Sequence, residues 1–247
     1  MKKPNKAMID GDIIAWKVAF VADIEGVMSI GSLITGLLNK WTPDCCDGTV
    51  IALSCPKSDN FRRDVYPGYK ENREDAYKPE FLKDVFDFLI EEYDYMILPK
   101  LEADDILGIY ASNGDAIAVT IDKDLKGVHG WHYNPNKDKE IRYVSKEEAY
   151  EFFCKQWMMG DSTDGIPGLW KIGPKKAEKF LSEWDKDDWE QNIIDLYDTD
   201  KHKVREDCDI PHPDIAIVMA RCVKILTKKE YNLNKKQIKL WCPKSGS

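Results

Sequence analysis

Short apolar segments alternate with longer amphipathic segments along the first 160 residues. Four apolar runs have the length of buried strands, at 6–9, 50–54 (VIALS), 93–99 (YDYMILP) and 116–121 (AIAVTI). Three segments between them have the apolar spacing of helices, at 13–22 (IIAWKVAFVA), 80–93 (EFLKDVFDFLIEEY) and 103–112 (ADDILGIYAS). Strands that alternate with helices predict an α/β fold, in which helices flank a mostly parallel central sheet.

The pattern changes near residue 160. Ser145 and Glu148 form a capping box that predicts a helix through 147–159. A stretch rich in glycine and proline follows at 160–184, and the segments 189–197 and 215–226 have the pattern of helices. We therefore predict an α/β core over 1–160 and a helical C-terminal part without strands over 161–247.

Composition narrows the class of protein. The chain of 247 residues is 43% hydrophobic, which is enough for a full core. Its apolar runs are too short to span a bilayer and its N-terminus lacks the apolar stretch of a signal peptide, so we expect a cytoplasmic protein without membrane contact. The seven cysteines form no C-x-x-C pair, and His129 and His132 lie in a segment (GVHGWHYNP) predicted as turns, so a zinc site is not expected.

Acidic residues follow the predicted strands. Asp10, Glu102 and Asp122 each come after one of them, and the carboxyl ends of parallel strands meet at one edge of the sheet, where ligands bind. The net charge of −8 at first argues against a nucleic-acid partner, which usually selects a basic domain. Because much of this charge belongs to the acidic cluster, the argument is weak.

The spacing of the acids lets neighbouring carboxylates share one side of an element. The pairs are Glu102 with Asp105, Asp122 with Asp124, and Asp161 with Asp164. Such a pair on its own is more often a helix cap or a surface charge, and Asp12 is well explained as a helix N-cap. Several pairs of hard oxygen ligands together favour Mg²⁺ or Mn²⁺, and two such ions can activate water for attack on a phosphodiester.

Four motifs together carry a resemblance to a known family. MIDGD at 8–12, LEADD at 101–105, TIDKD at 120–124 and MGDSTDGIPGLWKIGPKKA at 159–177 resemble the bacteriophage branch of the 5′ nucleases. This family comprises flap endonucleases and 5′→3′ exonucleases related to the nuclease domain of bacterial DNA polymerase I. The resemblance implies a PIN-like nuclease core and a helix-two-turn-helix element. It also implies two Mg²⁺ or Mn²⁺ ions held by Asp10, Glu102, Asp104, Asp105, Asp122, Asp124, Asp161 and Asp164.

The same resemblance implies the contacts with substrate. FRRDVYPGYKENR at 61–73 resembles the basic arch of the family, so Lys70 and Arg73 would act on the scissile phosphate. The other nucleic-acid contacts would be Arg62, Arg63, Tyr69, Gly168, Lys171, Gly173, Lys175 and Lys176, with K⁺ at the helix-two-turn-helix. The expected protein is a monomer that acts on duplex DNA with a 5′ end or flap, or on an RNA:DNA hybrid, in phage DNA replication or recombination.

One position departs from the family. After the strand VIAL the family has another metal-binding aspartate, whereas this chain has Ser54 and Cys55, with Asp59 several residues later. We expect one weakened metal site, or its repair by Asp59. The arch is also short before Pro79, which bears on whether a single strand threads through it.

Other functions fit part of the pattern. A ribonuclease that removes RNA primers would use the same site, and a non-catalytic protein that binds branched DNA would keep the fold without full activity. A haloacid dehalogenase-type phosphatase is suggested by DGD at 10–12 and GDSTD at 160–164. In that family the GD motif ends a strand, whereas here it follows a predicted helix, and the phosphatase leaves LEADD and TIDKD unexplained.

Overall fold

The computed structural model describes residues 2–73, 76–198 and 215–243. Its packing forms two compact units of several chain segments each. The first comprises Met1–Asn60, Tyr77–Lys146 and Ile225–Ile238, and the second comprises Phe61–Ala76, Glu147–Lys224 and Lys239–Ser247. The functional division at residue 160 stays a prediction. In the part of the chain described, no helix is long and apolar enough to cross a membrane.

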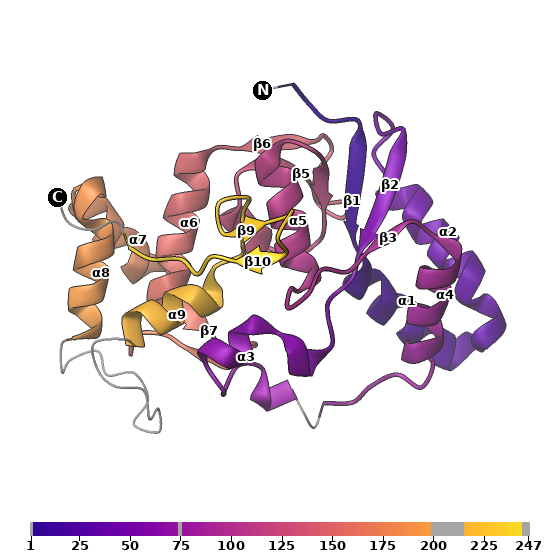
Figure 1. Ribbon diagram of the computed structural model, residues 1–247, viewed down its shortest axis with the longest axis horizontal. Coiled ribbons are helices and arrows are strands. Elements are labelled where there is room, and N and C mark those ends of the chain that lie inside the picture. Colours follow the sequence, from indigo (N-terminus) through magenta and orange to yellow (C-terminus); the bar gives the residue numbers. More distant parts are fainter. Residues whose placement is uncertain (1, 74–75, 199–214, 244–247) are drawn as a thin grey trace. The chain divides into compact units, whose positions relative to one another are not determined.

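A six-stranded sheet forms the centre of the first unit (Figure 1). Its strands are β1 (Lys6–Asp10), β2 (Gly48–Ala52), β3 (Tyr95–Met96), β4 (Ile117–Val119), β5 (Gly130–Tyr133) and β6 (Arg142–Val144), in the order β3-β2-β1-β4-β5-β6. Only β5 and β6 pair antiparallel. The predicted mostly parallel sheet is thus confirmed. Strand order reverses between β1 and β4, which makes their carboxyl ends the topological switch point.

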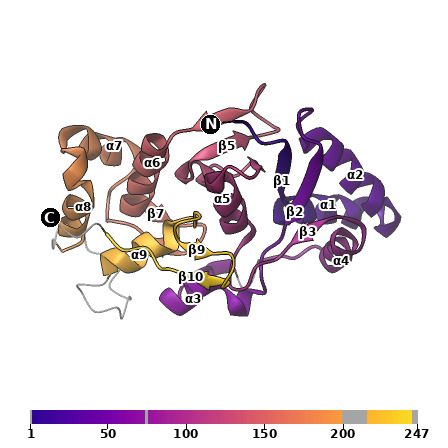
Figure 2. The same ribbon diagram turned by 45° about the horizontal axis from the view of Figure 1, so that its top comes forward.

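Helices cover both faces of this sheet. In Figures 1 and 2, α1 (Gly11–Glu25), α2 (Ile30–Trp41) and α4 (Leu82–Glu92) lie on one side, and α5 (Ala103–Asn113) lies on the other. Ala7 and Ile9 of β1 pack with the first group, whereas the intervening Met8 lies outside that cluster and is also buried. Because both faces are buried, the strands are nearly continuous apolar runs. Short 3₁₀ turns lie at Val27–Ser29, Lys57–Asp59 and Asp124–Gly127.

Several short strands differ from the predictions. The segment GVHGWHYNP, predicted as turns, contains β5, which pairs with both β4 and β6. The C-terminal part, predicted without strands, contains β7 (Gly160–Asp161), β8 (Ile166–Pro167), β9 (Tyr231–Asn232) and β10 (Gln237–Ile238). Both predictions were wrong. In the C-terminal part the reason is that a two-residue ladder is set by turn geometry and leaves no alternation in the sequence.

The second unit is mainly helical. It contains α3 (Phe61–Val65), α6 (Lys146–Met159), α7 (Pro174–Glu183), α8 (Trp189–Tyr197) and α9 (Ile215–Val223), with 3₁₀ turns at Glu71–Arg73 and Lys186–Asp188. Trp157 is central to its core: its indole N–H donates to the carbonyl of Ala216 at 2.7 Å, and its own carbonyl accepts from the hydroxyl of Tyr197 at 2.5 Å. These bonds fix α6, α8 and α9 to one another.

Two tight turns join α6 to α7. The amide of Gly165 donates to the carbonyl of Ser162 at 3.4 Å, and the amide of Ile172 donates to the carbonyl of Leu169 at 3.1 Å. Between these turns, a Cβ on Gly168 would lie 2.0 Å from the carbonyl oxygen of Met159, so only glycine fits there. The chain therefore forms the expected helix, two turns and a helix.

Candidate metal and nucleic-acid site

Asp10 joins β1 to β4 at the switch point. It ends β1 and caps α1, where its Oδ1 accepts from the amide of Ile13 at 3.1 Å. Its Oδ2 accepts from the hydroxyl of Thr120, just beyond β4, at 2.8 Å. Burial, and then the neighbouring charges of Asp12 and Asp122, raise the pKa of Asp10 to about 7. A nearby cation would stabilise the ionised form of this carboxylate.

The hydrogen bonds of Asp12 differ from those predicted from the sequence. Since Asp10 is the N-cap of α1, the prediction that Asp12 caps this helix was wrong. Instead, its two oxygens accept from the amide of Ser54 at 3.1 Å and from the hydroxyl of Ser54 at 2.5 Å. The Ser54 oxygen in turn accepts from the amide of Ala103 at 2.9 Å. Ser54, the departure from the family pattern, thus connects Asp12 to the first turn of α5.

Acidic groups also surround Cys55. Burial, and then the charges of Glu102, Asp59, Asp105 and Asp12, raise the pKa of its thiol to about 11. A thiol held in its protonated form is a poor metal ligand, since metals bind the thiolate. Asp59 is exposed and accepts from the hydroxyl of Ser58 at 2.9 Å. Its electrostatic effect on Cys55 keeps it a candidate to replace the missing aspartate.

The LEADD segment opens α5. Glu102 is the N-cap of this helix, and both Glu102 and Asp104 are half-buried. Asp105 is wholly buried: one oxygen accepts from the amide of Glu102 at 3.2 Å and the other from the amide of Leu226 at 3.0 Å. These two bonds give Asp105 a positioning role, because they hold the start of α5 and the segment after α9. Its predicted role as a metal ligand stays a prediction.

The TIDKD segment forms a compact loop after β4. The amide of Asp122 donates to Thr120 Oγ1 at 3.0 Å, and the amide of Asp124 donates to Asp122 Oδ1 at 2.8 Å. Thr120 therefore joins Asp10 directly to this loop. Sequence reasoning missed Thr120 and set Asp12 aside, although both lie inside the motifs TIDKD and MIDGD.

The donor set of the first unit fits a hard divalent cation. The side chains at this edge offer carboxylate oxygens, and Cys55 offers a protonated thiol. Within the described ranges, no group of three or more His, Cys, Asp or Glu side chains is already arranged closely enough to hold a metal ion. Carboxylates gathered without a cation repel one another, which is consistent with the raised pKa of Asp10. These residues supply suitable ligands that a cation would draw together.

Asp161 and Asp164 belong to the second unit. Asp161 Oδ1 accepts from the amide of Thr163 at 2.8 Å, which shapes the first turn. Asp164 forms a short ion pair with the guanidinium of Arg73, and the ammonium of Lys70 lies 3.6 Å from its other oxygen. Both predicted catalytic cations are thus paired with the same predicted metal ligand.

Lys70 is also held in an unusual backbone conformation. Its φ of 56° lies in the left-handed region, and its amide donates to the carbonyl of Asp164 at 2.8 Å. A lysine in this region is uncommon, and such conformations gather at functional sites. The turn between Ser162 and Gly165 therefore orients the end of the basic segment.

Two predicted contacts with nucleic acid are buried. Arg62 is 3% exposed, and its guanidinium donates to the carbonyls of Cys222 at 2.9 Å and Lys224 at 2.8 Å. Tyr69 is 2% exposed, and its hydroxyl donates to Asp164 at 3.3 Å. Their burial corrects the expectation that Arg62 contacts the strand and Tyr69 stacks on a base, since both stabilise the second unit. Arg63 is half-buried.

The lysines around the second turn are exposed. Lys171, Lys175 and Lys176 all face solvent, as does Gly173, which is the N-cap of α7. A Cβ at Gly173 would meet nothing within 4 Å, so local packing does not require glycine there. Helix N-termini with free amides and nearby lysines suit phosphate groups. This part of the second unit presents the chemistry of a phosphate-backbone contact.

Comparison with known proteins gives relatives among phage nucleases. A comparison with models of protein families gave no match. The exonuclease of Escherichia phage T7 is 28% identical over 228 residues, which cover 79% of this chain and 75% of the phage protein. The exodeoxyribonuclease of Enterobacteria phage T3 is 29% identical over 231 residues, which cover 80% of this chain and 75% of that protein.

DNA polymerase I is a partial relative. The enzyme of Rhizobium leguminosarum is 35% identical over 144 residues, which cover 50% of this chain but only 14% of the polymerase. The chain therefore corresponds to a small part of that enzyme.

Solved structures share the fold. The 5′-exonuclease of phage T5, solved with zinc ions, has a TM-score of 0.64 and 18% identity over 88% of this chain and 89% of its own. The flap endonuclease of phage T5, solved with DNA and metal ions, has a TM-score of 0.58 and 17% identity over 89% of this chain and 87% of its own. At these identities the likeness concerns the fold. The chain is homologous to the exonucleases of phages T7 and T3 and to the 5′ nuclease part of DNA polymerase I, which confirms the predicted resemblance to the bacteriophage 5′ nucleases.

Proposed function

We propose that this chain is a metal-dependent 5′ nuclease that hydrolyses phosphodiester bonds of DNA. The observation that carries the proposal is the linked set of carboxylates at the switch point of the sheet. Asp10 and Asp12 are bonded there to Thr120 and Ser54, which follow β4 and β2. The homologous phage proteins are named an exonuclease and an exodeoxyribonuclease, which supports the same reaction class here.

Carboxylates of the first unit would hold the metal ions, which we propose to be Mg²⁺ or Mn²⁺. The carboxylates at this edge belong to Asp10, Asp12, Glu102, Asp104, Asp122 and Asp124. When bound, divalent ions supply an activated water and a positive charge opposite the leaving oxygen of the phosphodiester. Ser54 positions Asp12, and Thr120 positions Asp10 and the loop at Asp122.

Residues of the second unit would position the nucleic acid. Lys70 and Arg73 would stabilise negative charge on the scissile phosphate once released from Asp164. The exposed Lys175 and Lys176 at the start of α7 would contact the backbone of a duplex. The same proposal includes a K⁺ ion at the helix-two-turn-helix and action on RNA:DNA hybrids. It also includes a monomeric state and a role in phage replication within the host cytoplasm.

Cleavage assays test this function directly. Flap, nicked-duplex and RNA:DNA substrates labelled at either end are incubated with Mg²⁺, Mn²⁺ or EDTA. We expect cleavage from or near the 5′ end in the presence of either cation, and none in EDTA. Asp122→Asn, purified in parallel, controls for contaminating nucleases and should lose activity while it still binds DNA. Full activity in EDTA, or cleavage by Asp122→Asn at the normal rate, would contradict the proposal.

The substrate series also separates the modes of cleavage. Release of mononucleotides from a nicked duplex indicates an exonuclease, whereas release of an intact flap indicates a structure-specific endonuclease. Preference for the RNA:DNA hybrid would favour removal of RNA primers. Structure-specific binding without cleavage under any metal condition would leave a non-catalytic DNA-binding protein.

A further inference from the structure

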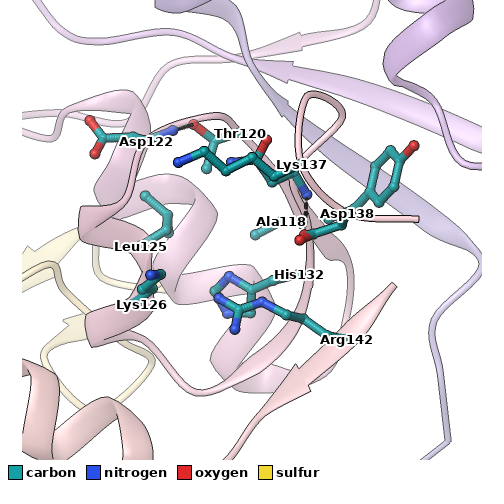
Figure 3. Close-up of a pocket in the computed structure, with 11 residues that line it drawn as sticks. Ala118, Thr120, Asp122, Leu125, Lys126, His132, Lys137, Asp138 and Arg142 are labelled. Atoms are coloured by element: carbon teal, nitrogen blue, oxygen red, sulfur yellow. Dashed lines mark hydrogen bonds between the residues drawn. The ribbon is translucent and has the colours of Figure 1, made fainter. Parts of the chain in front are cut away.

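A polar pocket of about 150 Å³ lies beside the carboxyl end of β4, inside the first unit (Figure 3). Its buried wall includes Thr120, Leu125 and His132. Its rim carries three exposed cations, Lys126, Lys137 and Arg142. Asp122 also lines the pocket, and in Figure 3 its carboxylate points away from His132 and Arg142.

His132 presents a buried hydrogen-bonding atom without a partner. It lies on β5 directly across from Arg142 of β6 and is only 5% exposed. The backbone of Val128 forms a hydrogen bond with the imidazole, whereas Nε2 is buried and has no hydrogen-bond partner among the described residues. Buried polar atoms are nearly always bonded, so Nε2 needs a partner, which is either water or a ligand that enters the pocket.

The protonation state of His132 defines what that ligand must offer. Burial, and then the charge of Arg142, lower the pKa of His132 to about 4, so the ring is neutral at physiological pH. With one ring nitrogen bonded to Val128, Nε2 of the neutral ring is an acceptor. The pocket therefore requires a ligand that donates an O–H or N–H bond.

The charges at the rim indicate the charge that the ligand must carry. Within the part of the chain described, none of the side chains of Lys126, Lys137 and Arg142 forms a salt bridge. The two lining carboxylates already accept backbone bonds: Asp138 from the amide of Asn134 at 2.7 Å and Asp122 from the amide of Asp124 at 2.8 Å. Three cations against two such carboxylates favour an anion.

We propose that this pocket binds a free 5′-mononucleotide, whose phosphate contacts the rim cations and whose sugar hydroxyl donates to His132 Nε2. A cavity of similar volume can hold one six-membered ring, so the sugar fits while the base stays at the mouth. The 5′-phosphorylated end of a DNA strand shares the phosphate, but its 3′ oxygen is esterified and has no proton to donate. The pocket therefore selects the free nucleotide, and this inference does not depend on nuclease activity.

Binding is measured in EDTA by NMR on protein labelled with ¹⁵N in histidine, with His132→Phe used to assign the ring signals. The probes are thymidine 5′-monophosphate, its 3′-deoxy analogue, inorganic phosphate and a 5′-phosphorylated oligothymidylate. We expect thymidine 5′-monophosphate to shift the Nε2 signal of His132. The 3′-deoxy analogue should bind about five- to tenfold more weakly, which corresponds to one hydrogen bond, and should leave that signal unchanged.

Charge variants test the anion contacts. Arg142→Gln and Lys137→Gln should each weaken binding of thymidine 5′-monophosphate about three- to tenfold. Lys139→Gln is the matched control, because Lys139 is exposed near the same turn and does not line the pocket. Circular dichroism checks that each variant is folded.

Four results with the nucleotides and the variants would overturn the proposal. They are an unchanged His132 signal at millimolar nucleotide, equal affinity for the 3′-deoxy analogue, equal affinity for the phosphorylated strand, and a loss of binding in Lys139→Gln as large as in Arg142→Gln. Binding of inorganic phosphate as tight as that of the nucleotide would also overturn it, since the sugar would then contribute nothing. Cleavage activity is not a readout, so failure here leaves the proposed nuclease function untouched.

Discussion

Asp10 should make the stability of the metal-free protein fall as pH rises from about 4 to 7. Its carboxyl has a pKa raised from 3.8 to about 7 by burial and by Asp12 and Asp122. A group whose pKa is higher in the folded state binds protons more tightly there, so its favourable contribution is fully present below the unfolded pKa. That contribution is lost as pH rises through the folded pKa. Asp10→Asn, which cannot ionise, should remove this pH dependence.

The magnitude follows from the size of the pKa change. At about 1.4 kcal/mol per pKa unit, the change from 3.8 to about 7 corresponds to a loss of about 4 kcal/mol across the whole range, and about half of it by pH 5.5. His132, whose pKa is lowered to about 4, gives the opposite slope in the same range. The difference between Asp10→Asn and wild type cancels that contribution, because His132 is present in both.

Urea unfolding in EDTA at several pH values between 4 and 8 measures this difference. The free energy of unfolding of Asp10→Asn, relative to wild type, should rise by about 4 kcal/mol across the range. Asp59→Asn removes one exposed charge and controls for net charge. Adding Mg²⁺ at pH 7 should stabilise wild type more than Asp10→Asn. A difference that stays constant with pH would refute the reasoning, because it would mean that Asp10 ionises as readily in the folded as in the unfolded chain.

Three further perturbations test other parts of the site. Ser54→Ala should lower the free energy of unfolding in EDTA by about 2 kcal/mol, because it removes a bond to the Asp12 carboxylate and the acceptor for Ala103, whereas the exposed Ser58→Ala should change it by less than about 0.5 kcal/mol. Replacing Lys175 and Lys176 with Ala should lower the salt slope of duplex binding, measured by fluorescence anisotropy, by about 0.9 per lost phosphate contact, and an unchanged slope would exclude them from the interface. Lys70→Ala should slow single-turnover cleavage at saturating enzyme while the Kd for DNA stays within about twofold; a defect in affinity alone would remove Lys70 from the chemical step.

The sheet edge was predictable because parallel topology alone determines where strand ends meet. Asp10 and the loop at Asp122 follow apolar runs that are easily recognised in the sequence, and the alternation of strands and helices places them together. The bond between Ser54 and Asp12 was not predictable in the same way. It joins residues 42 positions apart, and its geometry depends on the exact exit of the chain from β2.

The basic segment shows a different limit of sequence reasoning. Arg62, Arg63 and Tyr69 have the composition of a nucleic-acid surface, since charged and aromatic residues alternate there. The side chain of Arg62 is nevertheless buried, and its guanidinium donates to two backbone carbonyls that lie 160 and 162 residues later in the chain. Arginine can satisfy several carbonyls from one planar group, so a long-range contact can outweigh the local preference for solvent. Such a long-range contact leaves no periodic pattern in the sequence from which the burial of Arg62 could be predicted.

The order in which the chain is synthesised bears on when the first unit can be completed. Its sheet is fully encoded by residue 144, but the buried carboxylate of Asp105 accepts from the amide of Leu226, and the hydroxyl of Ser112 accepts from the amide of Lys228. Until those residues leave the ribosome, the carboxyl group of Asp105 lacks the amide of Leu226 as a donor. Helix α5 can therefore complete these hydrogen bonds only after the segment Ile225–Ile238 has been synthesised, well after the six strands of the sheet.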